Sequence, residues 1–132
     1  YMDRRTSRKV QMIRHFPDHD VTVRLNASLF EWVIENLSKN AVDAMEGAGT
    51  ITLTIDDTLA DRVIVEVSDT GKGIKKRDLR NVFRPGFTTK KRGWGLGLSL
   101  AKRIVEEYHH GRIFVKSSEL GKSTTFRIEL KR

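Results

Sequence analysis

Two asparagines on one predicted helix are the first residues whose types and spacing could do chemistry. The apolar pattern predicts a helix over about 28–45, in which Asn40 falls inside the apolar arc and Asn36 at its edge. Ser38 falls on the opposite, water-facing side. A buried carboxamide is costly unless its hydrogen bonds are met. Spaced i and i+4, the two amides either offer oxygens to a hard cation such as Mg²⁺ or bond to neighbouring backbone.

A carboxylate followed by two glycines is the second candidate. The string D-T-G-K-G at 69–73 comes directly after an alternating stretch, 62–68, that predicts a strand. Asp69 at a strand end can accept a hydrogen bond from an exocyclic amine, while Gly71 and Gly73 let the backbone approach a ligand closely. Alone, this string is more typical of a plain turn.

Glycines also open the second predicted helix, which spans about 97–109. The string G-W-G-L-G at 93–97 frees backbone N–H groups to face an anion, and the helix dipole favours phosphate there. The spacing fits neither a Rossmann fingerprint nor a P-loop, nor the glycine-rich loop of protein kinases. The stretch therefore has the parts of a phosphate site without a familiar nucleotide motif.

Together, these strings resemble the GHKL ATP-binding superfamily, which histidine kinases, gyrases, mismatch-repair ATPases and heat-shock chaperone ATPases share. In chain order they are E-N-L-S-K-N-A, D-T-G-K-G, F-R-P-G-F-T-T-K and G-W-G-L-G-L-S. The third, at 83–90, is similar to the F box of histidine kinases, and 121–126 resembles the last strand of the superfamily. The resemblance covers about 20–130 and implies the catalytic ATP-binding domain of a sensor histidine kinase, with ATP and Mg²⁺ as cofactors.

The resemblance also implies residue roles. Asn40 would ligate Mg²⁺ with Asn36 beside it, and these two with Lys90 would be the catalytic residues. Asp69 would bind the adenine amine, with Thr124 helping through water. The implied nucleotide contacts are Asn36, Asn40, Asp69, Gly71, Gly73, Ile74, Phe83, Thr88, Thr89, Lys90, Gly95, Leu96, Gly97, Leu98 and Thr124.

One residue separates the kinase from the hydrolase. The ATPase branches place a water-activating glutamate where this chain has Asn36, and Glu35 lies about 100° further round the helix. Asp43 stands where many histidine kinases have a cation, so Lys90 or a lid arginine would supply that charge. A GHKL-type ATPase, a docking module without kinase activity and a nucleic-acid binder with aromatic residues among its cations remain the alternatives.

None of the four histidines has the helical, acid-flanked context of a phosphoacceptor; they are His15, His19, His109 and His110. We therefore expect the isolated chain to bind ATP without labelling itself. The resemblance implies a histidine-bearing dimerisation domain outside this chain, a response-regulator receiver domain as partner, and no nucleic acid. It also implies a homodimeric full-length protein, with this fragment as a monomer.

Composition sets the frame for these residues. The chain has 132 residues, a net charge of +8 and no cysteine, which favours one domain, 1–132, in a cytoplasmic location, whether or not the parent protein is membrane-anchored. Residues 1–19 are expected to be partly linker or edge strand. Eight cations and one acid lie between 75 and 92. We expect 75–94 to form a mobile lid over the phosphates.

The elements that must position these residues alternate between strands and helices. Besides the two helices, we expect strands at 10–14, 21–25, 50–56, 62–68, 112–116 and 124–130, and a short helix around 78–83. Ser28 and Glu31 form a capping box for the first helix, and Gly47 is its expected stop. The expected fold is α+β, a two-layer sandwich of one mixed β-sheet with helices on one face.

Overall fold

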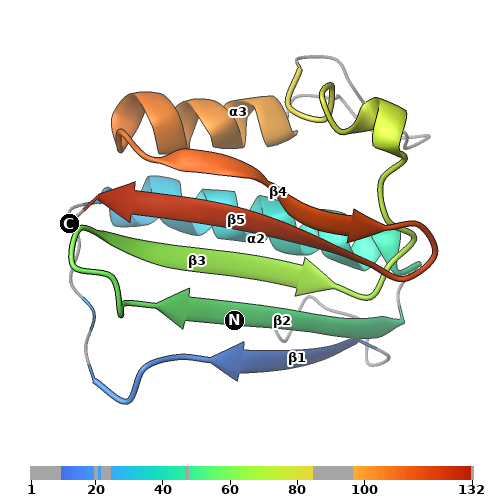
Figure 1. Ribbon diagram of the computed structural model, residues 1–132, viewed down its shortest axis with the longest axis horizontal. Helices are drawn as coiled ribbons and strands as arrows, with labels where there is room; N and C mark the ends of the chain where they lie inside the picture. The colour runs from blue at the N-terminus through green and yellow to red at the C-terminus, as the bar shows by residue number, and fades with distance from the viewer. Residues whose placement is uncertain (1–9, 20, 22–24, 47, 85–96, 132) are drawn as a thin grey trace.

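The computed structural model describes residues 10–19, 21, 25–46, 48–84 and 97–131. These residues form a five-stranded sheet in the order β1-β2-β3-β5-β4 (Figure 1). The strands are β1 (Val10–His15), β2 (Gly49–Asp56), β3 (Arg62–Asp69), β4 (Arg112–Glu119) and β5 (Ser123–Lys131). Strand β1 runs parallel to β2, and the other neighbours are antiparallel. The sheet is therefore mixed, as predicted.

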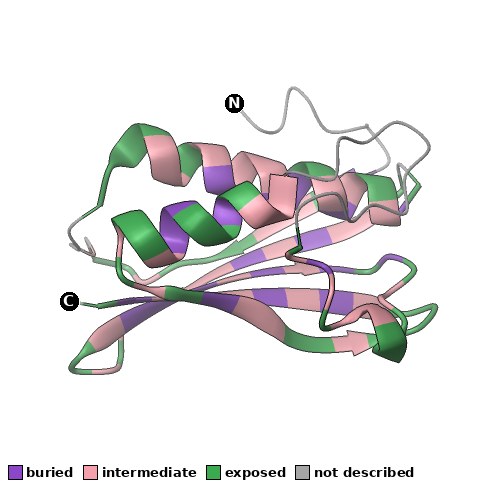
Figure 2. Cartoon of the chain, turned by 90° about the horizontal axis from the view of Figure 1, so that it is seen from above, coloured by how far each residue is buried: buried purple, intermediate pink, exposed green. Residues whose placement is uncertain are grey.

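Two helices cover one face of this sheet. Helix α2 (Ala27–Ala44) and helix α3 (Gly97–Arg103) lie on the same side, and α3 continues as a π-helical turn, η2 (Ile104–Tyr108) (Figure 2). No described helix is both long and apolar enough to cross a membrane. The predicted two-layer α+β architecture is confirmed, and the predicted second helix ends in a π rather than an α turn.

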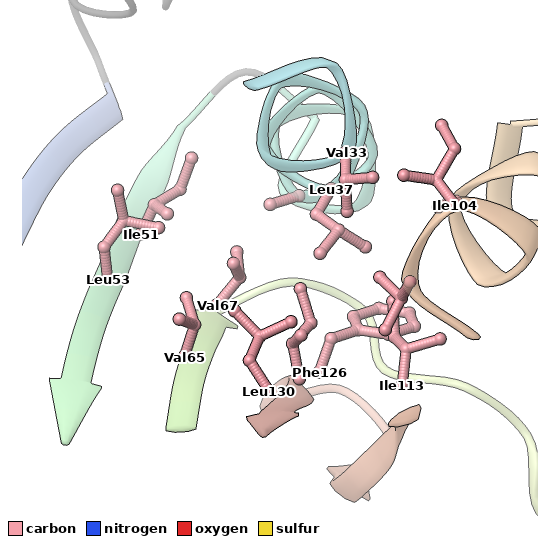
Figure 3. Close-up of a cluster of buried hydrophobic side chains, with 14 of the residues drawn as sticks. Val33, Leu37, Ile51, Leu53, Val65, Val67, Ile104, Ile113, Phe126 and Leu130 are labelled. Carbon is pink, nitrogen blue, oxygen red and sulfur yellow. The ribbon is translucent and has the colours of Figure 1, made fainter. Parts of the chain in front are cut away.

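The core fills the space between the sheet and the helices. Odd-numbered residues of β3, such as Val65 and Val67, face α2 because side chains alternate along a strand. Val33 and Leu37 from α2 and Ile104 from η2 meet them, as Figure 3 shows. Burial of each such side chain contributes about 1.5–3 kcal/mol. Asp69, which shares this parity, is carried into the same interior.

The opposite face of the sheet is polar and charge-paired. Glu66 on β3 lies 3.0 Å from Lys116 on β4 and 3.6 Å from Arg127 on β5. Arg127 also pairs with Glu129 at 3.1 Å. This face therefore carries paired charges across β3, β4 and β5, while the other face packs against the helices.

Helix α2 begins at Ala27, and its N-cap lies two residues before the predicted one. Its N-cap is Asn26, whose Oδ1 accepts a hydrogen bond from the Leu29 N–H at 3.1 Å. The predicted capping box at Ser28 is therefore wrong, because Ser28 already lies within the first turn. The helix ends at Ala44, and Glu46 takes the left-handed conformation with φ 55°. The predicted stop, Gly47, lies outside the described residues.

Two further expectations are corrected. Ser38 is fully buried rather than water-facing, and its hydroxyl has no hydrogen-bond partner among the described residues. Helix α2 thus buries a wider arc than its apolar residues indicate. The predicted strand at 21–25 is also not observed at Val21 and Leu25, which lie outside any strand; 22–24 are not described.

Candidate functional site

Asp69 is the last residue of β3 and the buried acidic group of the site. Only 5 % of its surface is exposed, and its Oδ1 accepts a hydrogen bond from the Gly71 N–H at 2.8 Å. Burial raises the pKa of the Asp69 carboxyl, and the Gly71 N–H partly opposes that rise. A buried carboxylate at a strand end is suited to accept a hydrogen bond from a ligand's N–H.

Thr124 on β5 lies directly opposite Asp69 in the sheet register and is 3 % exposed. Its Oγ1 lies 2.9 Å from the Oγ of Ser118 on β4. The same Ser118 Oγ accepts a hydrogen bond from the Ile74 N–H at 2.8 Å. The fold therefore brings Asp69 and Ile74 together with Thr124, which is distant from both in sequence, and Ser118 joins Ile74 to Thr124.

Sequence reasoning missed Ser118. Its strand was expected to end at residue 116, so both serines that follow fell outside it. A signal was present, because Ser118 and Thr124 are hydroxyl residues on the two sides of a predicted turn around Gly121, and such pairs face each other across a hairpin.

The segment after β3 is held between two elements. The Lys72 N–H donates to the Ala44 carbonyl of α2 at 3.0 Å, and the Lys72 carbonyl accepts from the Gly121 N–H at 2.8 Å. A Cβ on Gly71 would lie 2.7 Å from the Ala44 carbonyl carbon, and one on Gly73 would lie 2.4 Å from the Glu119 oxygen. Both glycines are therefore required by close backbone approach, and Gly73 also has φ 76°.

The two asparagines lie on α2, and Asn36 is the one beside the start of α3. Both are half-buried, one helical turn apart. A Cβ on Gly97 would lie 2.8 Å from the Asn36 Oδ1, so the N-terminus of α3 abuts Asn36. Leu98 packs against the core and anchors this helix start. The structure thus places the Asn36 amide next to the first turn of α3, where backbone N–H groups have no acceptor within the helix itself.

Phe83 lies in the described part of the predicted lid, shortly before residues 85–96, which the structure does not describe. The ring of Phe83 packs edge-on against the ring of Phe126, with 6.0 Å between the two ring centroids. Lys102 Nζ lies 5.6 Å from the centroid of the Phe83 ring. The short helix expected at 78–83 is instead a 3-10 helix, η1 (Lys76–Asp78), followed by turns. The remaining predicted site residues, Thr88, Thr89, Lys90, Gly95 and Leu96, lie outside the described residues.

The donor set fits a metal that arrives with its ligand. Among the residues that the structure describes, no cluster of three or more His, Cys, Asp or Glu could hold a cation. Asn40 and Asn36 provide neutral carboxamide oxygens, which match a Mg²⁺ ion that keeps waters and phosphate oxygens as its other ligands. These residues would not form an all-protein metal cage.

Comparisons with known proteins agree on one family. Residues 25–132 match the family described as "Histidine kinase-, DNA gyrase B-, and HSP90-like ATPase". The chain is 41% identical over 126 residues to the sensor histidine kinase ZraS of Salmonella typhi, covering 94% of this chain and 26% of that protein. It is 37% identical over 121 residues to sporulation kinase E of Bacillus subtilis, covering 92% of this chain and 16% of that protein. The chain thus spans about a quarter or less of these relatives.

Solved structures give the same picture. The nucleotide-free catalytic domain of histidine kinase ThkA superposes with a TM-score of 0.82 at 30% identity, covering 93% of this chain and 80% of that one. Full-length ShkA in complex with AMPPNP superposes with a TM-score of 0.80 at 26% identity, covering 92% of this chain and 25% of that one.

Proposed function

The chain belongs to the histidine kinase-, DNA gyrase B- and HSP90-like ATPase family as a histidine kinase catalytic domain, and on that premise we propose that it binds Mg²⁺-ATP between α2, the end of β3 and α3 and transfers the γ-phosphate to a histidine on a separate domain. The observation that carries the proposal is the buried Asp69 facing Thr124 across the β3–β5 pair.

Adenine recognition follows from the chemistry of Asp69. The exocyclic amine of adenine donates to a carboxylate, whereas guanine and hypoxanthine present a carbonyl oxygen at the same ring position. A buried carboxylate facing that oxygen would be left unpaired, at a cost of roughly 1–3 kcal/mol or more. The domain therefore prefers ATP over GTP. Ile74, directly after the D-T-G-K-G segment, is proposed to line the adenine base, and Thr124 supplies a hydroxyl next to Asp69.

The phosphates are proposed to lie between the asparagines and the start of α3. When bound, Mg²⁺ neutralises phosphate charge, with Asn40 as its protein ligand. Asn36 is held against Gly97 and orients the helix start toward the phosphates. Lys90, together with Thr88, Thr89, Gly95 and Leu96, is proposed to complete this side.

Transfer is favoured over hydrolysis because of Asn36. A carboxamide does not accept a proton at neutral pH, so it cannot activate water as a general base. A neutral imidazole is already a nucleophile at that pH. Positioning and charge stabilisation therefore suffice for transfer to histidine but leave water attack slow.

The acceptor is proposed to be a histidine of a separate dimerisation domain in a homodimeric, cytoplasmic signalling unit. A response-regulator receiver domain would take the phosphate next.

Within this chain, the Nε2 of His109 accepts from the Asn26 N–H at 2.9 Å, while its Nδ1 faces the Ile104 carbonyl at 2.8 Å. Since both ring nitrogens are engaged, His109 has none left for attack.

Calorimetric titration with Mg-ADP tests the site. Asn40→Ala is expected to remove the Mg²⁺-dependent part of the affinity and Asp69→Ala the adenine part, each by about tenfold or more. Lys39→Ala, an exposed neighbour on α2, is the matched control and should bind like the unmodified chain. Equal affinity of all four proteins would overturn the site assignment.

Phosphate release and transfer test the reaction. The chain alone should neither hydrolyse ATP quickly nor label itself, and an added acceptor domain from the parent protein should become labelled with acid-labile, base-stable phosphate. Rapid release by the chain alone that disappears in Glu35→Ala would assign the protein to the hydrolase branch instead.

A further inference from the structure

We propose that Ser118 is a positioning residue of the adenine site that sets its discrimination between bases, and that a β-bulge in β4 selects this serine over its neighbour Ser117. The inference rests on the nucleotide site proposed above. It adds a residue to that site and a reason for the irregularity of β4.

The bulge is visible in the strand register. Val115 pairs with Phe126, and an unbroken antiparallel ladder would then place Ser117 opposite Thr124. Instead the register shifts between Val115 and Ser117, so that Ser117 pairs with Thr125 and Ser118 with Thr124. A one-residue shift exchanges the two faces of a strand. The bulge therefore turns Ser118 inward and leaves Ser117 exposed, and bulges commonly re-aim side chains beside functional sites.

The hydroxyl of Ser118 is fully used. Its oxygen accepts from the Ile74 N–H at 2.8 Å, lies 2.9 Å from the Thr124 Oγ1 and can donate to the Ser123 carbonyl at 3.2 Å. A hydroxyl has one proton and two acceptor positions. With one acceptor position taken by Ile74, the Ser118 proton points either to Ser123 or to Thr124.

That choice sets what Thr124 presents to a ligand. If Ser118 donates to the Ser123 carbonyl, Thr124 donates back to Ser118 and offers only its oxygen. If Ser118 donates to Thr124, the Thr124 proton is available to a ring nitrogen or to a bridging water. In the second arrangement Ser118 occupies the Thr124 oxygen and directs the Thr124 proton to the acceptor nitrogen that adenine presents beside Asp69. Its bond to Ile74 fixes the backbone that enters this side of the site.

Removal of the hydroxyl should affect base recognition specifically. In Ser118→Ala the Ile74 N–H and the nearly buried Thr124 hydroxyl both lose a partner, and we expect the affinity for Mg-ADP to fall about tenfold. The affinity for Mg-IDP, whose base has a carbonyl in place of the amine, should fall less, so that the ADP-to-IDP ratio narrows. A merely structural defect would weaken both nucleotides equally.

The test compares four proteins by calorimetry: the unmodified chain, Ser118→Ala, Ser118→Thr and Ser117→Ala. Ser118→Thr keeps the hydroxyl and should retain the ADP-to-IDP ratio even if Ser118→Ala folds poorly. Ser117→Ala should bind like the unmodified chain. Two results would overturn the role of Ser118 while leaving the proposed function intact. One is an ADP-to-IDP affinity ratio in Ser118→Ala equal to that of Ser117→Ala, and the other is a narrowed ratio in Ser118→Thr. Absence of Mg-ADP binding by the unmodified chain overturns this inference together with the proposed function.

Discussion

The Asp69 carboxyl links the proposed nucleotide recognition to the stability of the fold. Because burial raises its pKa above the unfolded value, the folded state binds this proton more tightly than the unfolded chain does. The contribution of Asp69 to the free energy of unfolding therefore falls as the pH rises from the unfolded pKa through the folded pKa. Above the raised pKa the group is ionised, as the proposed contact with adenine requires, and its buried charge lowers the stability of the fold.

Asp69→Asn separates these two effects. The amide keeps an oxygen for the Gly71 N–H and carries no buried charge, so we expect a higher unfolding temperature than the unmodified chain at neutral pH. This difference should vanish at acidic pH, where the carboxyl is protonated in both states. Mg-ADP affinity should fall about tenfold or more. Thermal unfolding against pH, with the exposed Asp61→Asn as control, measures the stability part; a lower unfolding temperature at neutral pH would contradict it.

Two glycines with nearly the same φ angle differ in what surrounds them. Gly73 has φ 76° and Gly121 has φ 75°, but a Cβ on Gly121 would meet nothing within 4 Å. We expect Gly121→Ala to cost about 1–2 kcal/mol from the left-handed backbone alone. Gly73→Ala should cost more, because its Cβ would also press on the Glu119 carbonyl oxygen, and it should weaken Mg-ADP binding. Urea unfolding measures the stability loss in both variants. Equal losses would show that the Glu119 backbone of β4 shifts freely to make room for the new Cβ.

At the scale of elements, the start of α2 depends on Asn26. Removing the Asn26 side chain by substitution with Ala should lower the free energy of unfolding by about 1 kcal/mol, because the Leu29 N–H loses its acceptor. Ser28→Ala is the matched comparison and should change it by less than about 0.5 kcal/mol. Chemical denaturation of both variants checks this. A larger loss in Ser28→Ala would restore the capping box that the sequence indicates.

The sequence predicted most elements because their side-chain periods are strong. Alternation in β2 and β3 placed both strands, and the position of Asp69 at a strand end followed from it. The cap at Asn26 was missed because two polar residues, Asn26 and Ser28, both suit a helix start. The bulge that selects Ser118 was not predictable, since a shift between adjacent serines leaves the residue pattern unchanged. Ser38 shows the same limit, because a helical wheel cannot tell how wide an arc its neighbours cover.

At the scale of the whole molecule, exposed positive charge is concentrated in the segment that follows Ile74, next to the proposed site. The described sequence that follows Ile74 is rich in exposed cations; they are Lys75, Lys76, Arg77, Arg80 and Arg84. The net charge of +8 acts with them on a polyanionic ligand. Individually, such exposed groups contribute little to affinity, but together they raise the encounter rate at low salt.

We therefore expect Arg80→Gln to lower the association rate constant for Mg-ATP about twofold at low ionic strength and hardly at all at high ionic strength. Lys131→Gln, which removes the same charge at the last described residue of β5, away from Thr124, should leave the rate unchanged. Stopped-flow measurements with a fluorescent ATP analogue compare them. An equal loss in both variants would mean that only the net charge matters.

The pairing of β3 with β5 has a kinetic consequence. A short turn joins β2 to β3 and another joins β4 to β5. Strands β3 and β5 are separated by residues 70–122, so their contact closes the longest loop of the sheet. Asp69 lies on one side of this seam and Ser118 and Thr124 on the other. A nucleotide at the proposed site would bridge two hairpins that must separate when the domain unfolds. Bound nucleotide should therefore lower the rate constant of unfolding and leave that of refolding almost unchanged. The reason is that the binding surface exists only after the two hairpins have met.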